Sequence, residues 1–258
     1  MFFALLSSTP LLPSIRIPQQ THALDRLFGP EQFCALPNFL DASLVADLAA
    51  DVDSLRERLT PAAASPGHGS VEWLELSPEA PPADAADDAR GVRAREALLH
   101  FVGDLQQHIE SQTGITLDAH CELKYAYYPC GGGYQKHIDG VAWRSSTVAR
   151  EYSFLLYLNE GWQPGDGGHL RVFDLGGSHG HVDIPPAAGT LVVFKSDVVP
   201  HEVMPTFRKR LAIVGWLHRH VEPVEEDEDD ESLSPLARAI MEHYRSQGKD
   251  VRIDGSAR

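Results

Sequence analysis

The chain has 258 residues, of which 43% are hydrophobic and 23% charged, and its formal charge is -15. This length permits one large domain or two small ones with a substantial buried core, and the composition is that of a soluble globular protein. The negative charge disfavours a general binder of nucleic-acid backbones, which gathers Lys and Arg against the phosphates, although a local basic groove is compatible with it. No stretch reaches the ~20 apolar residues of a membrane helix, so we expect no membrane partner.

Cysteine content and the first residues bear on the compartment. Cys34, Cys121 and Cys130 contain no Cys-x-x-Cys pair and are too few for a disulfide framework, which favours a reducing, cytoplasmic setting. Residues 1–6 are apolar, but the run is short and carries no basic segment. A signal peptide is therefore disfavoured, and we expect residues 1–29 to form a flexible leader.

Two helices are predicted before residue 120, after a short strand and turn at 33–40. Asp41 is suited to cap a helix that runs to about residue 59. Aliphatic residues recur in it at helical spacing, namely Leu44, Val45, Leu48, Val52, Leu55 and Leu59. The stretch 61–88 is rich in Pro, Ala, Gly and Asp and predicts a long loop, with a short strand at 71–76. A second helix is predicted at 92–112, and Gly114 is its stop signal.

From Cys121 onward, short strand-like runs alternate with Gly and Pro turns. Eight strands are predicted, at 123–128, 135–138, 152–158, 169–173, 180–184, 190–195, 201–205 and 211–217. This order predicts a mainly β, α+β fold: a double-stranded β-helix, or jelly roll, that encloses a cavity between two sheets, with the N-terminal helices on one outer face. We expect one domain at 30–220, with helical support at 41–113 and the jelly-roll core at 120–220.

The segment 221–258 differs in composition from the rest of the chain. It begins with an acidic run at 222–231, which predicts an extended, solvated linker that aids solubility rather than docking a partner. Ser234 is suited to cap a final amphipathic helix with Leu236, Ile240 and Tyr244 on one side. We therefore expect an acidic linker followed by a C-terminal helix.

A metal site is predicted around His137 and Asp139, which follow a Pro/Gly turn at 129–133. Residues two apart in a strand face the same side, so the imidazole and the carboxylate can reach one point. His201 opens the next-to-last strand, where we expect a third ligand from the opposite sheet. Two imidazoles and one carboxylate occupy one face of an octahedral ion and leave three positions open. This is the pattern of non-haem Fe(II) oxygenases, whereas a structural zinc site is closed.

A rival ligand set lies at His179, His181 and Asp183, which form a His-x-His and a second His-x-Asp pattern. We favour the first set because the preceding turn and the spacing to His201 converge there, and we expect the 179–183 group on a solvent-facing hairpin edge. The other histidines of the strand region are expected to be structural, namely His169, His218 and His220.

Arg210 indicates a cosubstrate. It begins the last strand, one hairpin after His201, so we expect its side chain in the same cavity. Iron with open positions needs an electron source to activate oxygen, and a 2-oxoacid supplies electrons while it chelates two positions. A guanidinium binds the distal carboxylate of a dicarboxylic cosubstrate bidentately, and Tyr157 is placed to add a phenol donor. Strand alternation turns Lys209 away, whereas Arg208 shares the face of Arg210 and is a weaker competitor.

Several ordered blocks resemble the 2-oxoglutarate- and Fe(II)-dependent dioxygenases, and most of all prolyl hydroxylases of the oxygen-sensing, hypoxia-factor type and their bacterial relatives. The blocks are Tyr128-Pro129 with the Gly run, Tyr134, His137-Ile138-Asp139, Tyr157-Leu158-Asn159, Gly167-Gly168-His169-Leu170-Arg171-Val172-Phe173, Pro200-His201-Glu202-Val203 and Arg210. The resemblance covers roughly residues 123–217. Several blocks at compatible spacings are specific, whereas a lone His-x-Asp occurs by chance in many proteins.

The resemblance implies a set of ligands and a reaction. The implied iron ligands are His137, Asp139 and His201. Arg210 and Tyr157 would hold the C5 carboxylate of 2-oxoglutarate, and Tyr128 would lie near its metal-chelating end. The implied reaction uses O2, yields succinate and CO2, and hydroxylates a C–H bond, with ascorbate in support. The implied substrate is a prolyl residue of a protein such as a ribosomal protein or translation factor, or else a free amino acid or small molecule.

The sequence departs from the hypoxia-type pattern in two places. Val214 stands where that type has a threonine that helps with the cosubstrate carboxylate. The loop at 140–151 is longer, and we take Trp143 and Arg150 in it as candidate substrate contacts, whereas Tyr134 is as suited to packing as to function. The alternative from another class is a non-catalytic jelly-roll module or a cupin-like metal-binding isomerase, which needs no buried arginine facing the metal.

Overall fold

The structure is a computed structural model that describes residues 22–61, 70–76, 88–143, 147–173, 180–222 and 251–253, together with Glu242. The helices are α1 (Ala42–Ser54) and α2 (Ala89–Thr113), with short 3-10 turns η1 (His22–Leu27), η2 (Arg56–Arg58) and η3 (Pro164–Asp166). The strands are β1 (Phe33–Leu36), β2 (Thr60–Pro61), β3 (Glu72–Glu75), β4 (Cys121–Tyr128), β5 (Tyr134–His137), β6 (Val141–Trp143), β7 (Val148–Tyr157), β8 (Leu170–Phe173), β9 (His181–Ile184), β10 (Leu191–Lys195), β11 (His201–Val203), β12 (Arg210–His220) and β13 (Val251–Ile253).

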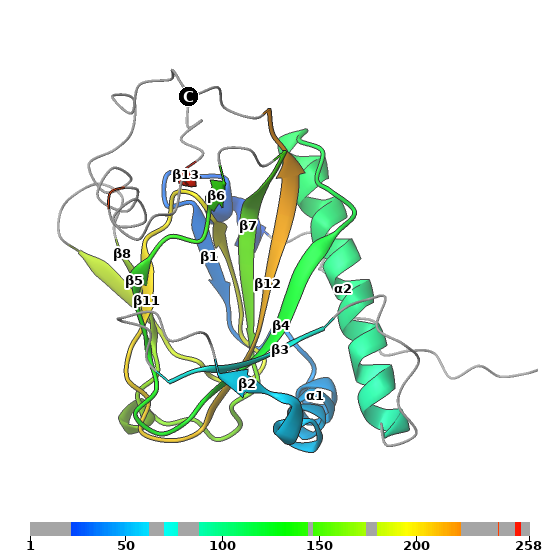
Figure 1. The fold of residues 1–258 in the computed structure, drawn as a ribbon, viewed down its shortest axis with the longest axis vertical. Helices are drawn as coiled ribbons and strands as arrows, with labels where there is room; N and C mark the ends of the chain where they lie inside the picture. The colour runs from blue at the N-terminus through cyan, green and yellow to red at the C-terminus, as the bar shows by residue number, and fades with distance from the viewer. Residues whose placement is uncertain are drawn as a thin grey trace, which may run out of the picture.

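The strands form two principal antiparallel sheets (Figure 1). The larger sheet has seven strands in the order β1-β10-β7-β12-β4-β3-β2, and the smaller has four in the order β5-β11-β8-β9. A separate pair joins β13 to β6. The eight predicted strands are all present with shifted ends, whereas β2, β6 and β13 are not among the sequence predictions. The mainly β, α+β jelly roll is confirmed.

Alternating side chains on the larger sheet supply two cores. On β7, Phe154 and Leu156 belong to a core shared with α1 and α2, whereas Leu155 and Tyr157 belong to a second core with residues of β8 and β11. The helices therefore cover the outer face of the larger sheet, as expected, and the second core lies between the two sheets (Figure 1). This period-2 alternation is why strand position predicts which side chains can reach the interior.

The helix ends follow from their capping residues. Asp41 Oδ1 accepts a hydrogen bond from Ser43 N at 2.8 Å and begins α1, as predicted. α2 begins three residues earlier than predicted because Asp88 caps it by accepting from Arg90 N. Gly114 ends α2 in the left-handed region, with φ 71. No helix of the described residues is long and apolar enough to cross a membrane.

The expected leader at 1–29 is wrong at its C-terminal end. Residues 22–27 form η1, and Leu24 and Leu27 are buried in the helix-side core. Apolar residues three apart lie on one side of a 3-10 turn, so this turn buries both. Residues 1–21, the acidic linker from 223 onward and the expected helix at Ser234 lie outside the described residues.

Candidate active site

Three side chains converge where the smaller sheet meets the interior. β5 and β11 are neighbours, and His137 lies directly opposite His201 in their antiparallel pairing. The ligand atoms of His137, Asp139 and His201 all lie within 4.8 Å of one another, and no other such group occurs in the described part of the chain. The expectation that His201 comes from the opposite sheet is wrong: cross-strand pairing on one sheet brings the two imidazoles together.

Hydrogen bonds to the backbone orient both imidazoles. His137 Nδ1 lies 2.7 Å from the carbonyl oxygen of Gln135, and His201 Nδ1 lies 3.1 Å from that of Val199. A carbonyl only accepts hydrogen bonds, so each Nδ1 carries the proton and each Nε2 keeps a lone pair. Both Nε2 atoms can therefore bind a metal, and the carbonyls fix the ring orientation in the way typical of metal-ligating histidines.

The distances within this group fit a metal ion. His137 Nε2 and Asp139 Oδ1 lie 3.1 Å apart. Two bare acceptors at this distance repel each other unless a cation or a proton lies between them. Ligands on adjacent corners of an octahedron are about 3 Å apart when each is about 2.1 Å from the ion. Two imidazoles and one carboxylate on one face leave three positions open, which fits Fe(II).

Charge and burial keep these ligands ready to bind a metal. Burial would raise the pKa of the Asp139 carboxyl, but His201, His137 and Arg150 hold it well below its usual range. Burial, and then the neighbouring His137, lower the pKa of His201 to about 4, although Asp139 opposes the shift. At neutral pH the carboxylate is therefore ionised and the His201 imidazole is neutral, as metal binding requires.

Arg210 and Tyr157 form a buried polar group in the inner core. Besides burial, the charges of Arg210 and of Asp139 both act on the pKa of the neighbouring Tyr128, which places this polar group near the metal ligands. Arg210 is 1% exposed, and its Nε donates to the Gly168 carbonyl at 2.9 Å. Its Nη1 and Nη2, and the Tyr157 hydroxyl, are buried without a hydrogen-bond partner among the described residues. Its guanidinium carbon lies 4.7 Å from the centroid of the Tyr128 ring and 5.0 Å from that of Tyr157.

An unpaired buried guanidinium is costly, so this polar group is suited to an anionic ligand. A carboxylate can accept from both terminal nitrogens of Arg210 at once. Burial raises the pKa of Tyr157 to about 12, so its hydroxyl stays a donor. The residues present therefore fit the distal carboxylate of 2-oxoglutarate. The place of Tyr128 at the chelating end stays a prediction.

The neighbours of Arg210 do not compete for this role. Arg208 is half exposed, and its Nη1 lies 3.1 Å from Asp166 Oδ2, so the competing assignment is wrong. Lys209 points away, as predicted, and pairs with Asp53. β11 and β12 belong to different sheets, so no hairpin joins His201 to Arg210. The chain crosses between the sheets, and Arg210 thus reaches the cavity from the opposite side.

Among the described residues, the rival histidine set forms no metal-binding cluster. His181 and Asp183 are exposed on β9, and Asp183 Oδ1 accepts from Arg171 Nε at 2.7 Å. His179 lies outside the described residues. The other histidines pack or pair elsewhere: His169 against the Trp162 ring, His218 with Glu122 and His220 with Asp118.

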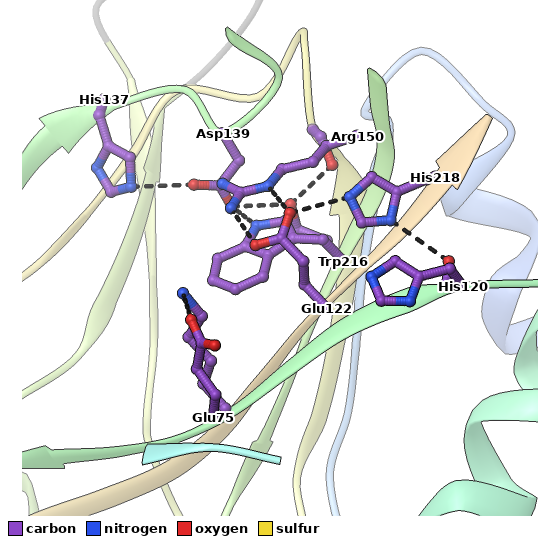
Figure 2. A network of polar contacts seen from close by, with 11 residues as sticks. Glu75, His120, Glu122, His137, Asp139, Arg150, Trp216 and His218 are labelled. Carbon is purple, nitrogen blue, oxygen red and sulfur yellow. Dashed lines mark hydrogen bonds and ion pairs between the residues drawn. The ribbon is translucent and has the colours of Figure 1, made fainter. Parts of the chain in front are cut away.

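Polar side chains that the sequence did not single out surround Asp139. Ser153 Oγ and Trp216 Nε1 both donate to Asp139 Oδ2, at 2.8 and 3.0 Å. Arg150 lies in β7 and not in a loop, and it donates Nε to Glu122 Oε1 at 2.9 Å (Figure 2). Ser153 lies on the same face of β7 as Tyr157, and Trp216 lies on the same face of β12 as Arg210. Counting every second residue from Tyr157 and Arg210 would therefore have identified both from the sequence.

Of the two candidate substrate contacts, Arg150 has a described side chain and Trp143 does not. Arg150 is half-buried, with part of its charge committed to Glu122. The side chain of Trp143, on β6, lies outside what the structure describes. Val214 is buried in the inner core, where its apolar side chain offers no hydrogen bond. A role in substrate binding for Arg150 and Trp143 stays a prediction.

Comparison with known proteins agrees with this geometry. A family model described as the 2OG-Fe(II) oxygenase superfamily matches residues 123–218. A crystal structure of a Pseudomonas putida prolyl-4-hydroxylase is 32% identical, with a TM-score of 0.64 over 76% of this chain and 97% of that chain. A Trichoplax adhaerens prolyl hydroxylase, solved with a peptide fragment of the hypoxia inducible factor oxygen degradation domain, is 25% identical, with a TM-score of 0.63 over 76% and 86%.

Two relatives known from sequence are longer than this chain. A Caenorhabditis elegans hypoxia-inducible factor prolyl hydroxylase is 36% identical over 134 residues, which is 51% of this chain and 17% of that protein. The human Egl nine homolog 1 is 33% identical over 123 residues, 46% of this chain and 28% of that protein. The chain thus spans less than a third of either relative. With its His-Asp-His group, its buried, unpaired Arg210 and a near full-length bacterial relative, it belongs to the 2OG-Fe(II) oxygenase superfamily, a family of dioxygenases that use Fe(II), 2-oxoglutarate and O2.

Proposed function

We propose that this dioxygenase hydroxylates a prolyl residue of a protein substrate, with succinate and CO2 as coproducts. The observation that carries the catalytic part is the pair of unpaired Arg210 and Tyr157 donors near the metal-binding group, since, besides burial, the charges of Arg210 and of Asp139 both act on the pKa of Tyr128. The prolyl part is supported by the relatives, because proteins similar to this chain in sequence and in structure include prolyl hydroxylases.

The residues divide the work of the reaction. Fe(II) held by His137, Asp139 and His201, together with 2-oxoglutarate and O2, would supply the oxidising chemistry that places one oxygen atom on the substrate carbon and the other in succinate. Arg210 and Tyr157 orient the cosubstrate by its distal carboxylate. The apolar inner core excludes water from the chelating end. Because both histidine Nδ1 atoms are hydrogen bonded to carbonyls, the ligand rings cannot turn away.

The substrate would approach over the side of the site where Arg150 and β6 lie. Arg150 is half-buried and close enough to Asp139 to lower the pKa of that carboxyl, and β6 follows Asp139 directly along the chain. We propose Arg150 and Trp143 as substrate contacts on this side. We also propose a cytoplasmic setting, because Cys34, Cys121 and Cys130 are free thiols. Ascorbate would serve as a supporting reductant.

Succinate-coupled turnover with proline-containing peptides tests this function. We expect succinate release together with a mass gain of one oxygen atom on a prolyl residue. His137→Ala should abolish both iron retention and turnover, whereas His181→Ala, in the rival set, should leave iron retention unchanged. Turnover on free amino acids or small molecules but on no peptide would contradict the prolyl substrate. A protein that binds iron and releases no succinate with any substrate would match the cupin-like alternative.

A further inference from the structure

The two oxygens of the Asp139 carboxylate face different partners. Oδ1 lies 3.1 Å from His137 Nε2 (Figure 2), and Oδ2 lies 3.8 Å from His201 Nε2, so Oδ1 is the oxygen closer to a ligand nitrogen. Oδ2 accepts two hydrogen bonds from side chains that are not metal ligands, one from Ser153 Oγ at 2.8 Å and one from Trp216 Nε1 at 3.0 Å. An ionised carboxylate oxygen offers about two acceptor sites, so both sites of Oδ2 are in use.

The serine donor is fixed by a second hydroxyl. Ser153 and Ser196 are both fully buried, and their Oγ atoms lie 2.8 Å apart. Each hydroxyl has a single hydrogen to donate. Ser153 gives its hydrogen to Asp139, so Ser196 must be the donor in the bond between the two serines. The result is a directed chain from Ser196 through Ser153 to Asp139.

The Trp216 ring is held in place by Arg150, which stacks on it and is itself paired with Glu122. The Arg150 guanidinium carbon is 4.0 Å from the centroid of the Trp216 ring, and Arg150 also forms a bidentate pair with Glu122 (Figure 2). Glu122 is the cross-strand partner of Trp216, and its Oε1 lies 2.9 Å from His218 Nε2. A cation stacked on an indole and anchored to a neighbouring strand prevents the ring from swinging.

A register shift in the sheet makes this stacking possible. Between β12 and β7, Leu217 pairs with Tyr152 and His218 with Arg150, so β7 has one extra residue at this point. Strict alternation would place Arg150 on the same face as Tyr152, which is packed on the helix side. A β-bulge changes the face to which the side chains next to the extra residue point. Here it turns the side chain of Arg150 onto the inner face, where Trp216 lies.

We infer that Ser153 and Trp216 are positioning residues that hold Asp139 as a one-oxygen ligand, with Ser196 and the Arg150–Glu122 pair as their supports. A carboxylate that binds through both oxygens occupies a fourth position of an octahedral ion. Two positions would then remain, and chelation by 2-oxoglutarate would fill both. Occupying Oδ2 with two donors keeps the third position open. The inference rests on the metal group and is independent of the prolyl substrate proposed above.

Water-proton relaxation by bound Mn(II) tests the inference without turnover. Mn(II) takes similar ligands, and it speeds the relaxation of water protons in proportion to the water molecules it coordinates. With saturating 2-oxoglutarate, wild-type protein should retain a relaxation enhancement from a coordinated water. Ser153→Ala and Trp216→Phe should lose most of this enhancement per bound ion. We also expect about 10- to 100-fold weaker Mn(II) affinity, as for other groups that orient metal ligands.

Matched variants separate positioning from general damage. Trp162→Phe also removes an indole donor, but its partner is the Gly167 carbonyl at 3.0 Å and not Asp139, so the enhancement should stay at the wild-type value. Ser153→Thr keeps the hydroxyl and should therefore show the wild-type relaxation enhancement. Because Ser196 acts through Ser153, the double variant Ser153→Ala/Ser196→Ala should equal Ser153→Ala. A wild-type enhancement in both Ser153→Ala and Trp216→Phe at Mn(II) saturation would overturn the inference, whatever their affinities.

Discussion

The guanidinium carbon of Arg210 lies 5.0 Å from the centroid of the Tyr157 ring, and both side chains end in buried polar atoms that no described residue satisfies. A folded protein rarely leaves such donors unpaired, so their arrangement carries information about the ligand. Nη1, Nη2 and the phenol hydroxyl are neighbouring hydrogen-bond donors, and a carboxylate is a ligand that can accept from all three.

Replacement of Arg210 should therefore weaken cosubstrate binding more than metal binding. Arg210→Ala removes two charged hydrogen bonds, and we expect the Kd of 2-oxoglutarate to rise about 100-fold or more. Arg210→Lys keeps the charge but loses the two-nitrogen fork, so its Kd for 2-oxoglutarate should lie between those of wild type and Arg210→Ala. Anaerobic titration of 2-oxoglutarate into the Fe(II) protein measures this. Arg208→Ala, which removes an exposed arginine paired with Asp166, is the control and should bind as wild type does.

Gly168 should be required for the orientation of Arg210. Its φ is +71, and a Cβ there would lie 3.0 Å from Arg210 Cδ. Gly168→Ala would strain the turn and push its Cβ against Arg210, whose Nε donates to the Gly168 carbonyl. The affinity for 2-oxoglutarate should therefore fall about tenfold. Gly165→Ala, in the same loop, meets nothing within 4 Å and should have no effect. Equal affinities in the two variants, measured by the same titration, would contradict this account.

Two glycines of α2 should respond oppositely to the same substitution. A Cβ on Gly91 would lie 2.0 Å from Asp51 Oδ1, whereas a Cβ on Gly103 meets nothing within 4 Å. Asp51 is 4% exposed and accepts from the Tyr125 hydroxyl at 2.6 Å and from Arg95 Nη1 at 2.9 Å. Gly91→Ala displaces this buried carboxylate and should destabilise the protein by about 1–3 kcal/mol.

Gly103→Ala should instead stabilise the protein by about 0.5–1 kcal/mol, because alanine loses less backbone entropy in a helix. Urea unfolding of both variants at neutral pH measures the two free energies. A loss of stability in Gly103→Ala, or a gain in Gly91→Ala, would show that the packing of α2 against α1 and β4 differs from the structure.

Stability should depend on pH through Glu122. Burial opposes ionisation of this carboxyl, but His218 and Arg150 lower its pKa from 4.5 to about 2. A lowered pKa in the folded state contributes stability that is fully present above the unfolded value and lost as pH falls toward the folded value. The contribution is on the order of 2–3 kcal/mol at neutral pH.

Glu122→Gln should therefore be less stable than wild type at about pH 6, and the difference should narrow as pH falls from about 5 to about 3. Denaturant unfolding over this range measures the difference in the free energy of unfolding. Glu75→Gln, which removes an exposed carboxylate on β3, is the control and should differ little from wild type throughout. A constant difference between Glu122→Gln and wild type would contradict the assignment.

Local pattern was enough to predict most of the fold and the principal ligands. Asp41 and Gly114 marked helix ends because capping and left-handed turns depend on one or two residues. His137 and Asp139 were paired by alternation along a strand, but β5 ends at His137, so Asp139 joins the group from two residues beyond the strand. Arg210 could be preferred to Lys209 by the same alternation, and the blocks around these residues carried the resemblance.

Long-range pairing decided the rest. The sequence alone did not show that His201 lies opposite His137 on one sheet, because register between distant strands depends on the whole fold. The sequence alone separated Arg208 from Arg210 only weakly. Arg210 is buried because β12 begins there, and the start of a strand depends on its pairing with distant strands. Arg150 was misplaced in a loop because β7 begins at Val148, four residues before the predicted start. The β-bulge that turns its side chain onto Trp216 leaves no local signature in the sequence. Residue types and strand parity thus determined the metal ligands and the cosubstrate arginine. Only the tertiary structure revealed the side chains that hold Asp139, because they come from separate strands that meet through packing.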